Sequence, residues 1–158
     1  MPKLQLLNGP NLNLLGRRET AIYGKRGLDE IVDECARFAQ DCGFELDHLQ
    51  SNAEARLIDA VQAAPAAGVD GIVLNPAGFT HTSVALRDSL LAVRLPFVEV
   101  HLSQPAARES FRQVSYFSDI ALGTIAGFGG DGYLLAVQAL INYLDTKPDG
   151  HSQDQETD

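Results

Sequence analysis

The sequence predicts one α/β domain with a five-stranded parallel sheet and helices on both faces. Five short apolar runs alternate along most of the chain with segments of helical spacing. The connections are long enough for the right-handed crossovers that join parallel strands. The 158 residues suffice for one domain with a substantial core, and we find no internal repeat. Such a pattern is typical of a parallel sheet covered on both sides.

The first half of the chain predicts two strands and two helices. A strand is expected over 3–7, where an apolar run ends at an Asn-Gly-Pro turn. Residues 28–41 have the apolar spacing of a helix, and a glycine follows as its stop. A second strand is expected over 44–49. Ser51 with Glu54 three positions later has the pattern of a capping box, which predicts a helix over 52–64.

The second half predicts three more strands, at 71–74, 97–102 and 121–128, and two more helices, at 80–93 and 132–144. The last strand is the weakest because Gly123 and Gly127 dilute it. Five strands in this pattern predict the flavodoxin-like order 2-1-3-4-5. We expect the domain to span residues 1–145 and the polar, charged tail 146–158 to be disordered.

Charge and cysteine content restrict the classes of partner. A formal net charge of −9 argues against nucleic acid or an anionic membrane as the main partner, although a few local arginines could still bind a small anion. Cys35 and Cys42 lie about two turns apart in one expected helix, too far apart to bridge, so we expect buried thiols. Without a signal peptide or a long apolar run, the predicted location is the cytoplasm. No Cys/His cluster has the spacing of metal ligands.

The loop over 8–24 is unusual for its position. It follows the first strand, where a compact α/β domain normally turns straight into a helix. Loops longer than about 12 residues are usually functional or disordered. This loop contains several Leu residues, Ile22 and Tyr23, unlike a disordered linker. We interpret it as a packed, functional loop that could serve as a lid.

Polar residues follow three strands that are neighbours in the expected order. Ligands of open α/β sheets bind at the carboxyl ends of the strands. The residues expected at this edge are Asn8 and Asn11 after the first strand, Asn75 and His81 after the third, and Glu99, His101 and Ser103 at the fourth. The topology therefore predicts one crevice at which they meet.

His101 is the strongest single candidate for a catalytic residue. Glu99 lies two positions earlier, so both side chains should leave the strand on the same side. A carboxylate orients an imidazole and favours its protonated form, which suits a general acid. A structural ion pair at a strand end is the alternative, and the spacing does not separate the two. His81 could instead cap the helix over 80–93. His48 and His151 have no informative context, and we expect them at the surface.

The arginines are the remaining candidates. A free tyrosine has a pKa of about 10, so Tyr23 would need cationic neighbours such as Arg18 to act as a base at neutral pH. The alternative is a packing anchor beside solvated charges. Arg108 and Arg112 lie one helical turn apart and form either an anion or hydroxyl clamp or a solvated helix face. None of the three lysines stands at a buried strand end, which argues against imine chemistry.

Several motifs, in this order, resemble type II 3-dehydroquinate dehydratases. They lie at 8–19, 23–24, 50–52, 75–76, 80–88, 99–103, 108–112 and 129–133, and the resemblance covers about residues 3–144. It implies a flavodoxin-like fold and an anti elimination of water from 3-dehydroquinate through an enolate, without a cofactor or metal. That step serves aromatic biosynthesis or quinate breakdown. The resemblance also implies a homododecamer built from trimers.

The resemblance assigns roles by residue. Tyr23 would be the base, Arg18 would keep it ionised, and Asn11 would hold a water at the enolate oxygen. His101, oriented by Glu99, would protonate the departing hydroxyl. The substrate-binding set would be Asn75, His81, Leu102, Ser103, Arg108 and Arg112, with Asp88 reaching a neighbouring subunit's site.

The sequence departs from the family pattern at three places. Thr20 replaces a usual Pro in the loop, 104–106 replaces Asn-Val-His, and 76–79 reads Pro-Ala-Gly-Phe where Pro-Gly-Ala-Tyr is usual. The alternative from another class is a flavin-binding electron carrier of the same fold. It would need aromatic residues around the flavin ring and a Ser/Thr-rich phosphate loop, and the chain has no Trp and no such loop.

Overall fold

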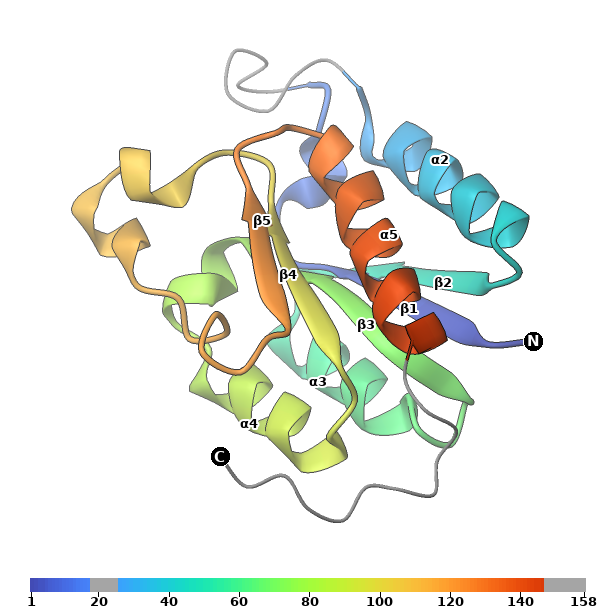
Figure 1. The fold of residues 1–158 in the computed structure, drawn as a ribbon. Helices are drawn as coiled ribbons and strands as arrows, with labels where there is room; N and C mark the ends of the chain where they lie inside the picture. Colours follow the sequence, from blue (N-terminus) through green and yellow to red (C-terminus); the bar gives the residue numbers. More distant parts are fainter. Residues whose placement is uncertain (18–25, 147–158) are drawn as a thin grey trace.

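The computed structural model describes residues 1–17 and 26–146 and confirms the predicted architecture (Figure 1). Its five parallel strands are β1 (Lys3–Asn8), β2 (Glu45–Gln50), β3 (Val69–Asn75), β4 (Phe97–His101) and β5 (Gly123–Ala126). They form one sheet in the order β2-β1-β3-β4-β5, as expected. The carboxyl ends of β1, β3 and β4 therefore lie side by side.

In the described part of the chain, four α-helices cover the sheet, two on each face (Figure 1). They are α2 (Leu28–Asp41), α3 (Glu54–Ala63), α4 (Val84–Val93) and α5 (Asp131–Thr146). α2 and α5 share one buried core with alternate side chains of the strands, and α3 and α4 share the other. Along β3, Val73 packs into the first core while Ile72 and Leu74 pack into the second, which follows the period of two of a strand.

Short 3-10 turns lie in the connections that follow β1, β3 and β4. They are η1 (Leu12–Leu14), η2 (Ala77–His81), η3 (Pro105–Ala107) and η4 (Ser110–Gln113). Gly9 holds the first two connections close together, because a Cβ there would lie 2.4 Å from the carbonyl oxygen of Pro76. Its N–H donates to the carbonyl oxygen of Asn75 at 2.8 Å. The loops that follow β1 and β3 are thereby locked to each other.

Two expected helix starts are wrong. Ser51 forms no capping box, because its Oγ accepts from the nearer N–H of Ala53 at 3.0 Å and α3 begins only at Glu54. The helix expected from residue 80 begins at Val84, and its cap is Ser83, whose Oγ accepts from the N–H of Leu86 at 3.0 Å. His81 lies in the preceding 3-10 turn and caps nothing.

The structure also bears on the smaller expectations about the cysteines, His48 and the tail. Cys35 is buried, and burial raises the pKa of its thiol to about 12. Cys42 is exposed because it follows the last helical residue of α2, so the expectation of a second buried thiol was wrong. His48 is half-buried and hydrogen-bonded to Asn8, so it is not a surface residue. The expected disordered tail, apart from Thr146, lies outside the described residues, as does Thr20.

Candidate active site

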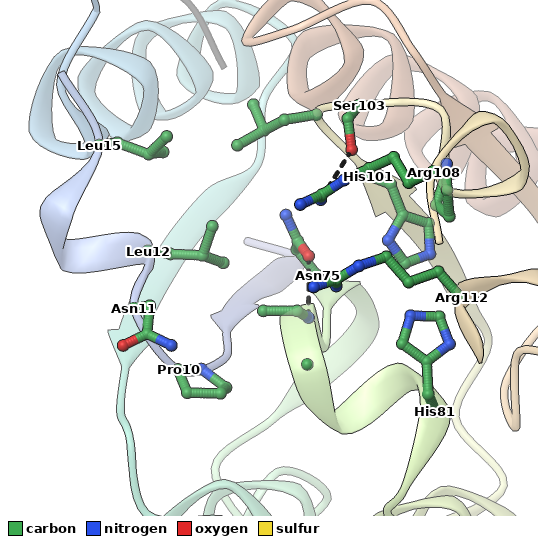
Figure 2. A pocket seen from close by; sticks show the side chains of 14 residues that line it. Pro10, Asn11, Leu12, Leu15, Asn75, His81, His101, Ser103, Arg108 and Arg112 are labelled. Carbon is green, nitrogen blue, oxygen red and sulfur yellow. Dashed lines mark hydrogen bonds between the residues drawn. The ribbon is translucent and has the colours of Figure 1, made fainter. Parts of the chain in front are cut away.

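A cavity of about 150 Å³ opens at the carboxyl ends of β1, β3 and β4 (Figure 2). This is the edge at which the sequence predicted a crevice. Its lining consists of Pro10, Asn11, Leu12, Leu15, Asn75, Ala77, Gly78, His81, His101, Leu102, Ser103, Pro105, Arg108 and Arg112. Figure 2 shows the residues of 10–15 on one side of the cavity and His81 and the two arginines on the other.

Asn75 stands at the end of β3, where its side-chain amide is held at both atoms. Its Oδ1 accepts from the N–H of Ala77 at 3.0 Å, and its Nδ2 donates to the hydroxyl of Tyr133 at 2.8 Å. The residue is only 3% exposed. An amide nitrogen has two hydrogens, so one N–H of Asn75 remains for a ligand in the cavity.

Glu99 and His101 leave β4 on the same side, as predicted, and the Nε2 of His101 hydrogen-bonds the Glu99 carboxylate. Glu99 is fully buried and also accepts from Ser118 at 2.7 Å and from Ser115 at 2.9 Å. Burial alone would raise the pKa of the Glu99 carboxyl, but the hydrogen bonds from His101 and Ser118 hold that pKa below its ordinary value.

This pair has a clear chemical capacity. An ionised, buried carboxylate stabilises a positive charge on the imidazole that it contacts. Nε2 of His101 is occupied by Glu99, and Nδ1 has no hydrogen-bond partner among residues 1–17 and 26–146. His101 lines the cavity. The ring can therefore donate a proton to a cavity ligand through Nδ1.

Arg108 and Arg112 approach the cavity from the segment that follows β4. The α-helical spacing assumed for them is wrong, because Arg108 follows η3 in extended backbone and Arg112 lies in the separate 3-10 turn η4. Both nevertheless line the cavity. Arg108 donates to Ser103 Oγ at 3.4 Å, and Arg112 Nε donates to the Glu109 carboxylate at 2.6 Å.

His81 lines the same side of the cavity, and Phe111 packs beside it outside the lining. The Nδ1 of His81 lies 2.7 Å from the carbonyl oxygen of Val114, and since a carbonyl only accepts, Nδ1 must be the donor. In the neutral ring this leaves Nε2 as an acceptor. The ring of Phe111 meets His81 edge to face, and the guanidinium of Arg112 lies 4.9 Å from the centre of the Phe111 ring.

Asn11 lies across the cavity in the left-handed backbone region, with φ 69°. Its N–H donates to Asn52 Oδ1 at 2.9 Å, and that oxygen also accepts from Gln50 at 3.2 Å. Leu12 and Leu15 supply apolar surface beside it. The side chain of Asn11 is exposed on this wall, where it can meet a ligand.

The structure brings most of the predicted residues together. Those that line the cavity are Asn11, Asn75, His81, His101, Leu102, Ser103, Arg108 and Arg112. Glu99 lies behind His101, whereas Asp88 is exposed on α4 and does not line the cavity. Arg18 and Tyr23 lie outside the described residues. No group of three His, Cys, Asp or Glu residues in the described part of the chain is arranged to hold a metal ion.

Sequence reasoning missed three supporting residues. Tyr133 was noted only within a motif, yet its hydroxyl joins Asn75 to Asn8. The signal available was a polar atom on an otherwise apolar helix face. Ser115 and Ser118 hold Glu99 from a loop without regular structure, and no spacing rule points to them.

Comparisons with known proteins agree on one family. The family model described as "Dehydroquinase class II" matches residues 2–141. A 3-dehydroquinate dehydratase of Shewanella denitrificans is 59% identical over 145 residues, which cover 92% of this chain and 94% of the relative. The 3-dehydroquinate dehydratase 1 of Pseudomonas aeruginosa is 56% identical over 144 residues, which cover 91% of this chain and 98% of the relative.

Solved structures agree with the sequence matches. The type II dehydroquinase of Butyrivibrio crossotus is 39% identical, with a TM-score of 0.86, and the match covers 89% of this chain and 97% of that one. The type II dehydroquinase of Propionibacterium acnes is 37% identical, with a TM-score of 0.85, and the match covers 90% and 97% of the two chains.

Proposed function

Since the chain belongs to the class II dehydroquinase family, we infer that it is a lyase that converts 3-dehydroquinate to 3-dehydroshikimate by loss of water. The single observation that supports this most strongly is the buried Glu99–His101 pair at the wall of the cavity. The relatives named above are all dehydratases or dehydroquinases. The flavin-binding electron carrier is left without support.

The proposed reaction separates the loss of the proton from the loss of the hydroxyl. A base removes the proton next to the ketone, and the electron pair of that C–H bond forms an enolate. The enolate then collapses to the enone and expels the hydroxyl group, which takes a proton from His101 and leaves as water. Glu99 keeps the ring oriented and supports its positive charge. Anti geometry requires the acid and the base on opposite faces of the substrate.

The base is assigned from the sequence motif. We propose Tyr23 as the base and Arg18 as the cation that keeps it ionised; both lie outside the described residues. Asn11 would hold a water at the enolate oxygen, and its exposed position across the cavity from the arginines is compatible with this role.

Substrate binding falls to the remaining lining residues. The chain has a formal net charge of −9, yet Arg108 and Arg112 place two cations at this cavity, which suits the carboxylate of the substrate. Asn75, His81 and Ser103 offer polar atoms for its hydroxyls. Leu102 and Ser103 would contribute backbone N–H groups.

We further propose that the enzyme is a homododecamer of four trimers in the cytoplasm. Asp88 is exposed outside the cavity of its own chain, which is compatible with a role in a neighbouring subunit's site. Large apolar side chains, Leu122, Phe128 and Leu135, are exposed beside the edge strand β5. No helix in the described ranges has both the length and the apolar character that a bilayer crossing requires. Light scattering should give twelve times the chain mass of 17.0 kDa; a monomer would contradict the assembly.

The activity is tested directly by adding 3-dehydroquinate and following the absorbance of the product enone. Turnover should persist with a chelator present and after borohydride treatment. Tyr23→Phe should lower kcat by about 100-fold or more, because the proposed base is lost, while thermal unfolding stays near wild type. Absence of enone formation, or a bound flavin in the purified protein, would contradict the function. Inactivation by borohydride would show imine chemistry instead.

A further inference from the structure

A chain of hydrogen bonds, buried at its centre, runs from the cavity wall through the protein to β2. The Ala77 N–H donates to Asn75 Oδ1 at 3.0 Å, and Asn75 Nδ2 donates to the Tyr133 hydroxyl at 2.8 Å. That hydroxyl donates to Asn8 Oδ1 at 2.6 Å, and Asn8 Nδ2 lies 3.1 Å from Nε2 of His48. The chain joins the loop after β3, the helix α5 and the strands β1 and β2.

The direction of every bond in this chain follows from its first member. A backbone N–H can only donate, so the oxygen of the Asn75 amide must face Ala77. The nitrogen of that amide must then face Tyr133, whose oxygen accepts from it. The single hydroxyl proton of Tyr133 therefore goes to Asn8, and Asn8 offers its own N–H to His48, which accepts as a neutral ring.

Burial makes this arrangement costly to disturb. Asn8 and Tyr133 are fully buried and Asn75 is 3% exposed, so water cannot replace a lost partner. An unsatisfied buried polar group costs about 1–3 kcal/mol. Burial also raises the pKa of the Tyr133 phenol above its ordinary value, so the phenol remains neutral and can both accept and donate. Its ring packs in the core shared by α2 and α5.

We propose that Tyr133 is a positioning residue, which fixes the Asn75 amide so that it presents an N–H, not its oxygen, to the substrate. This rests on the function proposed above, and it defines the substrate atom at that point as an acceptor, a hydroxyl or carboxylate oxygen. With both amide atoms held, one N–H of Asn75 is directed at the ligand before the ligand arrives. This preorganisation lowers the cost of binding.

A double-mutant cycle in kcat/KM tests this coupling. Tyr133→Phe removes only the hydroxyl and should lower kcat/KM about tenfold, mainly through KM, because the Asn75 amide is no longer held. In an Asn75→Ala background the same change should have no further effect. Tyr143→Phe on the same helix, where the ring is 39% exposed, is the matched control and should leave kcat/KM unchanged. If the losses in the double variant multiply, Tyr133 does not act through Asn75 and the proposal is overturned.

A second pair of variants covers the case in which Tyr133→Phe fails to fold. Asn8→Asp retains an oxygen that accepts from the Tyr133 hydroxyl, so kcat/KM should stay within about threefold of wild type. Asn8→Ala removes that acceptor and should raise KM about tenfold, with thermal unfolding used to show that both variants are folded. Equal losses in the two variants would contradict the proposal.

One readout does not depend on the reaction. The side-chain amide NMR signal of Asn75 in the ligand-free protein should shift in Tyr133→Phe and stay in place in Tyr143→Phe. An unmoved signal in Tyr133→Phe would overturn the proposal even in an active enzyme. A wild-type protein inactive towards 3-dehydroquinate, with the signal shifted as expected, would instead refute the proposed function alone.

Discussion

The two sides of the cavity formed after β3 and β4 differ in how they are held. The strand-end wall consists of Asn75 and His101, with Glu99 behind His101, and these three residues are 0–8% exposed. Asn75 and Glu99 are held by hydrogen bonds to partners elsewhere in the sequence: Asn75 donates to Tyr133, and Glu99 accepts from Ser115 and Ser118. The arginine rim, Arg108 and Arg112, has side chains 19% and 25% exposed, and both pair with the adjacent Glu109.

The buried wall fixes the geometry of the site, whereas the partly exposed rim supplies positive charge. A buried polar group keeps its partners because losing one costs about 1–3 kcal/mol, so the wall has one arrangement that the whole fold enforces. A partly exposed ion pair contributes little to stability, typically about 0–1 kcal/mol. The rim can therefore adjust to a ligand, and its cations act mainly on substrate affinity.

Glu99→Gln should damage the wall most. The groups around Glu99 are donors, so a glutamine would turn its NH₂ against at least one of them. We expect unfolding in denaturant to show a loss of about 3 kcal/mol, and kcat to fall about 100-fold because His101 loses its counter-charge.

The same variant should change the pH dependence of stability. The pKa of Glu99 is depressed in the folded state, so its contribution is present above the pKa of the unfolded chain and is lost as pH falls through the folded pKa. Glu99→Gln should lack this acid-side loss. Wild-type stability and kcat in Glu99→Gln would show that the pair is only a passive contact.

Arg112→Gln should change affinity and leave stability alone. Losing one cation at the rim should raise KM about tenfold, as expected for a charge-assisted hydrogen bond to a carboxylate. The free energy of unfolding should stay within about 0.5 kcal/mol of wild type. Arg56→Gln, an exposed arginine on α3, is the control and should alter neither quantity. A large loss of stability in Arg112→Gln would remove the distinction between rim and wall.

Ala77→Gly should stabilise the protein by relieving backbone strain next to the wall. Ala77 has a φ of 51°, in the left-handed region that favours glycine, and the family pattern usually has glycine at this position. The left-handed conformation costs an L-residue about 1–2 kcal/mol, part of which the greater flexibility of glycine in the unfolded chain offsets. Unfolding in denaturant should show a gain of about 0.5 kcal/mol. A loss of stability would mean that Ala77 is not strained.

His48→Gln should have the smallest effect, visible only in a pH series. Burial lowers the pKa of His48, with the nearby Asp29 opposing this, so the unfolded chain binds the proton more readily. Wild-type stability should therefore fall as pH drops below the unfolded pKa of about 6.5. His48→Gln should lose less stability over that range. Identical pH profiles would show that His48 is not the outer end of the wall's hydrogen-bond chain.

The fold and much of the site followed from local rules. Strand and helix periodicity predicted the sheet order, and the spacing of Glu99 and His101 predicted their contact, because alternate strand residues share a side. The helix caps did not follow: Ser51 does not cap α3, and α4 is capped by Ser83 and not by His81, since a serine oxygen takes whichever N–H the backbone places nearest. That placement depends on tertiary packing.

Local sequence patterns could not predict the hydrogen-bond chain behind the wall. Tyr133 lies 58 residues from Asn75 and 125 residues from Asn8, so their contact depends on the docking of α5 against the sheet. His48 meets Asn8 only because β2 pairs with β1 in one register. The base assigned to Tyr23 stays a prediction, because residues 18–25 lie outside the described part of the chain.

Deuterium exchange catalysed by His101→Ala tests whether His101 is the acid of a stepwise elimination. In D₂O with 3-dehydroquinate, NMR would follow the hydrogen next to the ketone while absorbance follows the enone. The variant should still exchange this hydrogen, because the base remains, while enone formation should fall about 1,000-fold. Enone formation at the wild-type rate, or the loss of exchange together with elimination in a folded variant, would contradict this role of His101.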